Sequence, residues 1–265
     1  MPTSKENLVS MLKDLGLRSS DDVFVHSSLK SLGYVINGPY DVIDSLIEVI
    51  NIDKGTILMP AHSGQLTDPV GWTNPPLSVN DVEEVRDKMN LFDKKLTPTR
   101  GRGIVAQSFL SYKGVKRSEH PLNSVSALGK NAEWYTSEHS FHEPEGIESP
   151  IGKLFSKNGK VIGLGVGVTR FTAIHLAEYI ADVEYLKYDN PSVLIKNEND
   201  KNIFKEIKRY PGSSEKFTNI LPILRNENLI TELKFNGNIM TCLIIKPVVE
   251  RIVEILSEDP NFLIK

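Results

Sequence analysis

A histidine and a glutamate lie three positions apart in the segment TRFTAIHLAEY, at His175 and Glu178. In a helix this spacing places both side chains on one face, close enough to interact. A carboxylate beside an imidazole holds the ring and raises its basicity, which suits a general base that works near neutral pH. Spacing alone is weak support, because many solvated helices carry such a pair. The segment therefore agrees with a proton-handling site and also with an ordinary polar helix surface.

Phe171 and Asp182 fall on the same predicted stripe of this helix. We expect the ring of Phe171 to project toward the substrate side, because it lies one turn before His175. The opposite face is apolar and is predicted to be buried; it consists of Ala173, Ile174, Ala177, Ile180 and Ala181. The segment thus predicts an amphipathic helix that presents a polar stripe.

Three alternating glycines precede this helix in KVIGLGVG, at Gly163, Gly165 and Gly167. We predict a strand with all three on one face, where another backbone, a helix or a ligand can approach closely. They do not form a dinucleotide fingerprint, because Val168 stands where the third glycine is needed and no ribose-binding acid follows. Since α/β proteins build sites where a strand end leads into a helix, the glycines favour a functional role for the pair.

Two further segments have residue types that bind anions. VHSSLKSLG contains a predicted strand that ends in His-Ser-Ser, and its turn offers backbone N–H groups and two hydroxyls. TPTRGRG places Arg100 and Arg102 between glycines, which permit close backbone approach, and arginine binds phosphate with two parallel hydrogen bonds. Each segment alone also agrees with a plain turn. Together they predict a phosphorylated ligand.

The elements around these residues alternate between strand and helix. A strand at VFVHSS, a helix over residues 40–50 and a strand at TILMPA predict a crossover unit in a parallel sheet. Residues 62–101 are irregular and rich in Pro, Gly, Thr and Asn, which is typical of a binding loop. Beyond residue 181 we expect antiparallel strands around the turn NENDKN.

These elements predict an α/β fold with a mixed central sheet flanked by helices and an elaborated, partly antiparallel C-terminal part. We expect a single domain over residues 1–265. A two-lobe arrangement, with a core over about residues 1–180 and an elaboration over about 181–265, is the alternative.

The composition argues against several classes of protein. Of the 265 residues, 40% are hydrophobic and 25% charged, and the net charge of −3 provides no strong attraction to nucleic acid or anionic membranes. No run approaches 18 apolar residues and no targeting signal is evident, so we expect a cytoplasmic protein with no membrane partner. The single cysteine, Cys242, is expected to be buried, and we expect no metal. His139 and His142 are expected to be solvated in a loop.

In their order along the chain, several segments resemble the aminoglycoside 3-N-acetyltransferase family. The matching stretches are VHSSLKSLG, GTILMPAHS, LTPTRGRGIVAQSF, RSEHPLNSVSALG, GIESPIGKLF and GLGVG followed by TAIHLAEY. The resemblance is strong over about residues 5–182. It implies an N-acyltransferase that uses acetyl-CoA or another short acyl-CoA, with an α/β/α-type fold distinct from that of the common acetyltransferases.

The resemblance also implies roles for individual residues. His175 would be the general base that removes a proton from the acceptor amine, a contribution of about 10²–10⁴ in rate, with Glu178 beside it. The acyl-CoA would be held by His26, Ser27, Ser28, Leu29, Thr97, Thr99, Arg100, Gly101, Arg102 and Gly103. Backbone N–H groups near Ser27–Leu29 would stabilise the oxyanion. The expected substrate-binding residues are Phe171, Asp68, Glu148 and Asp182.

Several alternatives remain open on the sequence alone. An aminoglycoside-like acceptor, and with it antibiotic resistance, is favoured. Its rival is a nucleotide-linked amino sugar acylated during surface-polysaccharide synthesis, because an aromatic ring at Phe171 suits an apolar or flat partner better than a polycation. A serine hydrolase using Ser27 or Ser28 with His175 lacks the G-x-S-x-G elbow. A non-catalytic protein that binds CoA or sugar is the remaining class, and the chain is expected to be a monomer or homodimer.

Overall fold

A mixed β-sheet forms the centre of the molecule. The structure is a computed structural model that describes residues 2–188 and 190–265. Within these residues, seven strands are arranged in the order β3-β4-β2-β1-β5-β9-β8. Their bounds are β1 Asp22–Ser27, β2 Thr56–Pro60, β3 Lys116–Arg117, β4 Val125–Gly129, β5 Lys160–Leu164, β8 Thr231–Phe235 and β9 Asn238–Ile244. Strands β2, β1 and β5 are parallel, and the outer strands pair antiparallel on both sides. The predicted α/β fold with a mixed sheet is confirmed.

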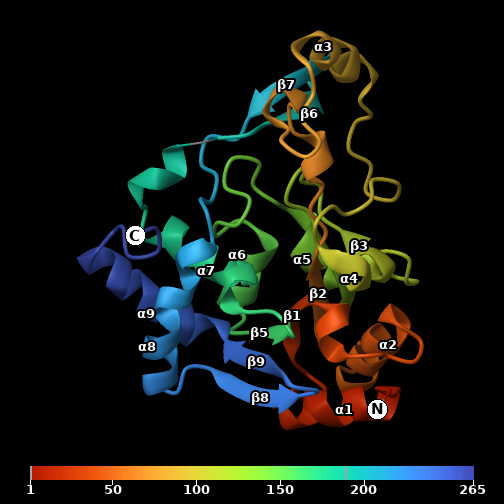
Figure 1. The fold of residues 1–265 in the computed structure, drawn as a ribbon, viewed down its shortest axis with the longest axis vertical. Coiled ribbons are helices and arrows are strands. Elements are labelled where there is room, and N and C mark those ends of the chain that lie inside the picture. Colours follow the sequence, from red (N-terminus) through yellow and green to blue (C-terminus); the bar gives the residue numbers. More distant parts are fainter. Residues whose placement is uncertain (1, 189) are drawn as a thin grey trace.

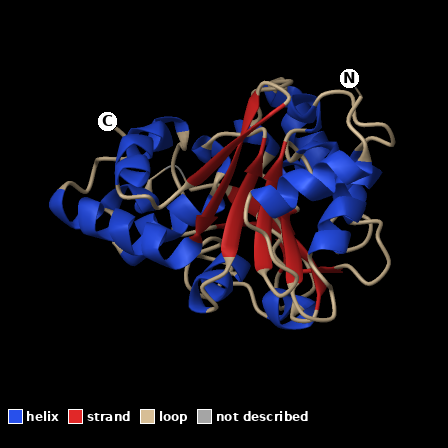
Figure 2. Ribbon diagram, turned by 90° about the horizontal axis from the view of Figure 1, so that it is seen from below, coloured by secondary structure: helices blue, strands red, loops and turns tan. Residues whose placement is uncertain are grey.

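Helices cover both faces of this sheet, as Figure 2 shows. Helices α1 (Lys5–Asp14), α2 (Pro39–Val49) and α4 (Gly103–Phe109) bury one apolar cluster against the sheet. The opposite cluster is covered by α5 (Ala132–Ser137), α6 (Pro150–Ser156), α7 (Thr172–Ile180), α8 (Leu221–Asn226) and α9 (Ile245–Glu258). None of the helices in the described part of the chain is long and apolar enough to cross a membrane.

The first half of the sheet contains the predicted strand–helix–strand unit. Strands β1 and β2 pair in parallel, with Val23 opposite Ile57. Helix α2 connects them and begins at Pro39, whose fixed φ and missing N–H suit the first helical turn. Strands β8 and β9 then add residues from beyond position 230 to the same sheet. Residues from both halves of the chain therefore share one sheet.

An arm projects from this body at the top of Figure 1. We use the term arm for residues 62–101, which include α3 (Val79–Lys88), together with the hairpin of β6 (Ser192–Lys196) and β7 (Asn202–Glu206). The two parts are joined by a β-bridge between Thr67 and Val193. The predicted antiparallel strands around NENDKN are confirmed as this hairpin.

The predicted glycine-lined strand face is wrong, because β5 already ends at Leu164. Gly165 has a φ of +68°, outside the strand region, and a Cβ there would lie 2.3 Å from the Cβ of Ser31. A Cβ on Gly163 would lie 2.7 Å from Cε1 of the Phe171 ring. These two glycines therefore make room for side chains of the protein itself.

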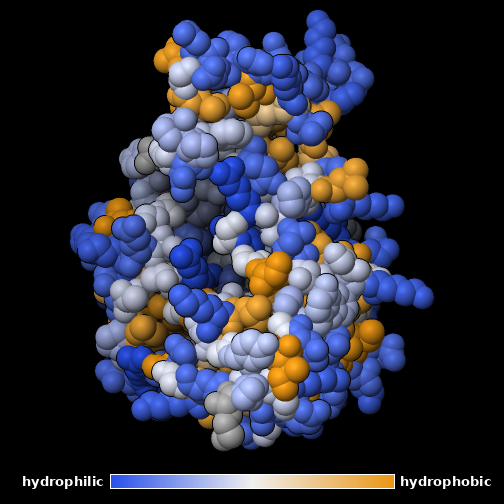
Figure 3. All heavy atoms as spheres, turned by 45° about the vertical axis from the view of Figure 1, so that its right-hand side comes forward, coloured by the Kyte–Doolittle hydropathy of each residue, from blue (hydrophilic) through white to orange (hydrophobic). Residues whose placement is uncertain are grey.

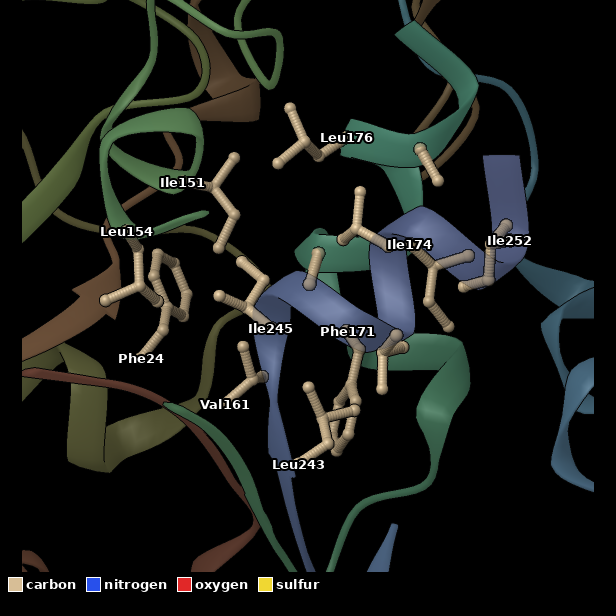
Figure 4. Packing of buried hydrophobic residues seen from close by; sticks show 14 of the residues in the cluster. Phe24, Ile151, Leu154, Val161, Phe171, Ile174, Leu176, Leu243, Ile245 and Ile252 are labelled. Carbon is tan, nitrogen blue, oxygen red and sulfur yellow. The ribbon is translucent and has the colours of Figure 1, made fainter. Parts of the chain in front are cut away.

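Phe171 belongs to the core, so the expectation that its ring faces the substrate is wrong. The residue precedes the first turn of α7 and is 0% exposed. Figure 4 shows its side chain near Leu243. Asp182 lies beyond the last turn of α7 with a φ of 51°, so it does not continue the helical stripe. Burial of apolar side chains around β5 and β9 placed the Phe171 ring in the core, although its i, i+4 spacing from His175 had predicted that it faces the substrate.

Candidate active site

Two adjoining cavities lie where the carboxyl ends of β1 and β5 meet the start of α7. Their volumes are about 580 Å³ and about 520 Å³. Both are lined by Arg102, Thr169 and Arg170, so that these residues form a shared wall. The carboxyl end of parallel strands is the usual place for ligands in α/β folds. Figure 3 shows a face of the molecule that is hollowed near its centre and lined largely by hydrophilic residues.

His175 lies in the wall of the first cavity and is held by a buried carboxylate. Its Nδ1 donates to Oε2 of Glu178 at 2.7 Å, and Oε1 of the same glutamate accepts from the hydroxyl of Tyr185 at 2.9 Å. Glu178 is 0% exposed, whereas the His175 side chain retains 14% exposure. Because the carboxylate engages Nδ1, Nε2 is the nitrogen left to exchange a proton.

Charge around His175 makes its imidazole more basic than usual. Burial alone lowers the pKa of His175, but the negative charges of Glu178 and Glu145 and the hydrogen bond to Glu178 outweigh that effect, so the pKa is raised. The ring also contacts Phe217 edge-on, with centroids 4.7 Å apart. The arrangement therefore supplies an oriented base on the cavity wall.

The same cavity is also lined by four further polar residues, His62, Asn123, Glu145 and Tyr210. Asn123 Nδ2 donates to Oε1 of Glu145 at 3.0 Å. Burial and the nearby Glu145 raise the pKa of Tyr210 to about 12, so its hydroxyl stays protonated. Burial holds the pKa of His62 well below its ordinary value, so this ring is neutral. These residues offer hydrogen-bonding groups to a ligand in the first cavity.

The second cavity contains the His-Ser-Ser turn that follows β1. His26 is 4% exposed, and its ring stacks on Phe171 at 5.6 Å between centroids. Its Nε2 accepts from the backbone N–H of Thr172 at 3.4 Å, so the ring fastens the start of α7 to β1. Burial and the charge of Arg102 lower the pKa of His26 to about 3. His26 is thus a neutral hydrogen-bond acceptor.

A family profile described as aminoglycoside 3-N-acetyltransferase matches residues 24–257. The chain belongs to this family. Accordingly the protein is an acetyltransferase, and acetyl-CoA is the co-substrate of the family's enzymes. The matched region includes both cavities and every strand of the central sheet except the first two residues of β1.

Individual relatives agree with this assignment. The SPbeta prophage-derived aminoglycoside N(3')-acetyltransferase-like protein YokD of Bacillus subtilis (strain 168) is 38% identical over 220 residues, which cover 83% of this chain and 79% of that protein. The crystal structure of YokD matches 98% of this chain and 96% of its own, with a TM-score of 0.90 and 32% identity. Aminoglycoside N(3)-acetyltransferase IX of Micromonospora chalcea is 28% identical, covering 80% of this chain and 75% of that protein. The sisomicin-bound structure of AAC-VIa is 25% identical, with a TM-score of 0.78, and covers 97% of this chain and 98% of its own.

Only some of the residues that were predicted to bind acyl-CoA lie together in the second cavity of the acetyltransferase. His26, Ser27, Ser28, Leu29, Gly101, Arg102 and Gly103 line the second cavity. Thr99 instead donates from its backbone N–H and its hydroxyl to Oε1 of Gln107. Arg100 instead makes its contacts within the arm, where it donates to the carbonyl of Asn74 and lies over the ring of Trp72. Thr97 lines a separate pocket that is formed by residues of the arm itself.

The predicted substrate carboxylates also lie outside the first cavity. Asp68 is paired with Arg86 in the arm, at 2.8 Å. Asp182 is paired with Arg209 at 2.7 Å. Glu148 is exposed and lines neither cavity. Within the described residues, then, the structure does not bring these three carboxylates to His175.

Four further lining residues of the first cavity were not predicted from the sequence. His62, Asn123, Glu145 and Tyr210 come from four separate loops, and no periodic pattern connects them. One signal in the sequence was Glu145, a carboxylate placed between Pro144 and Gly146. In the folded protein this residue is only 4% exposed. Another was the placement of His62 at the start of the predicted binding loop.

The remaining histidine and cysteine expectations have mixed outcomes. His139 is not a solvated loop residue: its Nδ1 lies 2.9 Å from the hydroxyl of Ser118, its Nε2 lies 2.6 Å from the Pro144 carbonyl oxygen, and burial holds its pKa well below the ordinary value. The burial of Cys242 is confirmed. Among the described residues, no three His, Cys, Asp or Glu side chains gather in a way that could hold a metal ion.

Proposed function

We propose that this acetyltransferase transfers the acetyl group of acetyl-CoA to an amino group of an aminoglycoside-like amino sugar, with His175 as the general base. The observation that carries the proposal is the 2.7 Å hydrogen bond between His175 and the fully buried Glu178, in the wall of a cavity that adjoins a second one. The aminoglycoside N(3)-acetyltransferases among the relatives support the acceptor class, as does the sisomicin bound to AAC-VIa.

In this proposal the two cavities hold the two substrates. The Ser27–Leu29 turn and residues 101–103 bind acetyl-CoA in the second cavity, and backbone N–H groups near Ser28 stabilise the oxyanion. The acceptor binds in the first cavity, beside His175. An amine attacks a thioester only when it is neutral, and Nε2 of His175 accepts the proton that the attacking nitrogen loses. As the C–S bond breaks, the imidazolium can return this proton to the departing sulfur.

Glu178 has a positioning role in this mechanism. Its carboxylate selects the tautomer with hydrogen on Nδ1 and stabilises the imidazolium that forms when Nε2 takes a proton. Tyr185 in turn donates to the other carboxylate oxygen and holds it in place. Because Glu178 is completely buried, water does not compete for this carboxylate.

One observation supports a second acceptor, a nucleotide-linked amino sugar. Arg102 and Arg170 lie in the wall shared by the two cavities, where guanidinium groups suit a diphosphate. Phe171 does not favour this acceptor, since its ring is buried in the core and cannot contact a ligand. The serine hydrolase is disfavoured, because Ser27 and Ser28 line the second cavity and His175 the first. Among the described residues, no hydrogen bond joins His175 to either serine.

Thiol release from acetyl-CoA tests these functions directly. The protein is incubated with acetyl-CoA alone, with kanamycin-type antibiotics and with nucleotide-linked amino sugars. We expect thiol release that requires an amine and is fastest with a kanamycin-type acceptor. Release without an amine would indicate hydrolysis, and release only with the nucleotide-linked sugar would support the second acceptor. Absence of release with every acceptor contradicts the proposed function.

Replacement of the base tests the mechanism. We expect His175→Ala to lower turnover by about 10² or more, because general-base catalysis contributes roughly 10²–10⁴ in rate. Binding of CoA, measured by calorimetry, should remain nearly unchanged, since His175 lines only the first cavity. The matched control is His142→Ala, a partly buried histidine outside both cavities. Turnover of His175→Ala near the wild-type value would remove His175 from the role of base.

A further inference from the structure

Arg102 is a cation in the wall between the two cavities, and it has no partner within the protein. Its side chain is partly buried and lines both cavities. Within residues 2–188 and 190–265 the guanidinium makes no hydrogen bond or ion pair, and its Nε is buried without an acceptor. A buried donor of a charged group that lacks an acceptor is costly. Arg102 is therefore free to donate to a ligand that occupies the cavities.

Two glycines hold the backbone of Arg102 beside the turn that follows β1. Gly101 and Gly103 have φ values of +72° and +82°, which glycine adopts readily, and Arg102 between them precedes the first turn of α4. A Cβ on Gly103 would lie 3.7 Å from the carbonyl oxygen of Ser27. The segment that carries Arg102 therefore packs against the turn that is proposed to bind acetyl-CoA.

The charge of Arg102 acts on groups in both cavities. Burial and then the charge of Arg102 lower the pKa of His26 in the second cavity to about 3. At His175 in the first cavity, burial and the charge of Arg102 lower the pKa, against the larger opposite effect of Glu178 and Glu145. The guanidinium thus lies within electrostatic reach of the proposed base and of the acetyl-CoA turn at the same time.

Other donors near this wall are engaged or more exposed. The backbone N–H of Ser28 donates to the carbonyl of Leu164 at 2.9 Å, so it is not available to a ligand. Arg170 lines both cavities as well, but its side chain is exposed, and water screens its charge more strongly. Among the residues that the structure describes, no acid lines the second cavity, so the charge of Arg102 is not neutralised there.

The chemistry of acetyl transfer indicates which atom meets this charge. The acetyl group must be reached from both cavities, because it passes from the sulfur to the amine, whereas the phosphates of CoA are separated from the sulfur by the whole pantetheine arm. When the nitrogen–carbon bond forms, the carbonyl π electrons move to the oxygen, which stays negative until the carbon–sulfur bond breaks. A fixed cation at that oxygen stabilises the transition state more than the ground state.

We propose that Arg102 is a catalytic residue, which binds the carbonyl oxygen of the acetyl group and stabilises the oxyanion that forms there. The inference rests on the proposed function for the identity of the reaction. It gives the two sides of the reaction centre opposite tasks: His175 takes the proton from the nitrogen, and Arg102 stabilises the charge on the oxygen.

Two variants of similar length but different charge test this role. We expect Arg102→Met to lower kcat for kanamycin acetylation by about 10² or more, because loss of one oxyanion donor costs about 10²–10³ in rate. Arg102→Lys should stay at least about tenfold faster than Arg102→Met, since its charge remains. The Kd of CoA, which carries no acetyl oxygen, should change by less than about threefold when measured by calorimetry. Arg18→Met is the matched control, an exposed arginine outside both cavities.

The outcomes separate this role from simple binding. A raised Kd of CoA with unchanged kcat overturns the proposal, because Arg102 would then bind a phosphate of the co-substrate. A raised KM for the acceptor with unchanged kcat overturns it as well, and so does an Arg102→Lys variant as slow as Arg102→Met. Circular dichroism and a thermal midpoint at or above the wild-type value show that Arg102→Met is folded, since the change removes an unpaired charge. A wild type that releases no thiol with any amine contradicts the proposed function, whereas an active wild type with equally active variants contradicts only the role of Arg102.

Discussion

At the scale of single residues, the partner on Nδ1 determines how His175 titrates. The negative charge of Glu178 raises the pKa of the imidazole against the opposing effect of burial. A base must be unprotonated before it can accept a proton, so activity should fall as the pH drops below the pKa of His175. Glu178 strengthens the base, and it therefore also moves the acid limb of the pH–activity profile to higher pH.

We expect Glu178→Gln to move the acid limb of kcat/KM to lower pH, because loss of the negative charge lowers the pKa of His175. On the alkaline plateau, turnover should fall by about tenfold or more, since the weaker base accepts the proton less readily. The measurement is a pH–rate profile of thiol release for both forms. Glu184→Gln, an exposed glutamate paired with Lys187, should keep the wild-type profile. An unshifted acid limb in Glu178→Gln would assign that limb to another group.

At the scale of elements, the connection from β5 to α7 places His175 at the cavity. Its path depends on close approach between Gly165 and the turn that carries Ser31. The glycine has a φ of +68°, a conformation that residues with a Cβ adopt at a cost. The connection also passes Phe171, whose ring anchors it in the core.

We expect Gly165→Ala to reduce the free energy of unfolding by about 2 kcal/mol or more, from the positive φ and the clash with Ser31 together. Gly167→Ala is the matched control, because this glycine has a φ of −81° and nothing within 4 Å of an added Cβ. Its effect should stay within about 0.5 kcal/mol. Urea unfolding of the two variants measures the difference. Equal stabilities would mean that the connection shifts freely, contrary to the close packing seen at Ser31.

At the scale of the whole molecule, several buried histidines make the fold sensitive to acid. Burial lowers the pKa of His26 to about 3 and that of His120 to about 4, and it holds the pKa of His62 and His139 well below the ordinary value. In the unfolded chain each of them titrates near its ordinary pKa of about 6.5. Between pH 6.5 and 4 the unfolded state therefore binds more protons than the folded state, so stability falls as the pH falls. His175, with its raised pKa, opposes this trend.

We expect the free energy of unfolding to decrease by several kcal/mol from pH 7 to pH 5, at about 2 kcal/mol for each histidine that stays neutral in the fold. Urea unfolding at the two pH values, followed by circular dichroism, measures the change. The contribution of His120 should level off below about pH 4, where this ring is protonated in the folded state as well, whereas that of His26 should continue to about pH 3. A stability that is the same at pH 7 and pH 5 would show that these rings are not buried in neutral form.

Much of the fold was predictable from the sequence because it depends on local patterns. The crossover unit of β1, α2 and β2 follows from apolar periodicity, and the hairpin of β6 and β7 from its turn residues. Strand β8 was missed because it is largely exposed and lacks a regular apolar pattern, and β3 was missed because it has only two residues, both of them basic. The His175–Glu178 pair was also predictable, because helical spacing alone brings the two side chains together.

The contacts between near neighbours in the chain, and the family to which the motifs belong, follow from the amino-acid sequence alone. The tertiary structure was needed to show that Phe171 lies in the core, that Arg100 binds the carbonyl of Asn74, and that Asp68 and Asp182 are paired with arginines of the protein. It also brought Glu145 to His175 from a separate loop. The physical reason is that local backbone geometry relates residues a few positions apart, whereas the meeting of distant loops depends on how the whole sheet and its helices bury apolar surface.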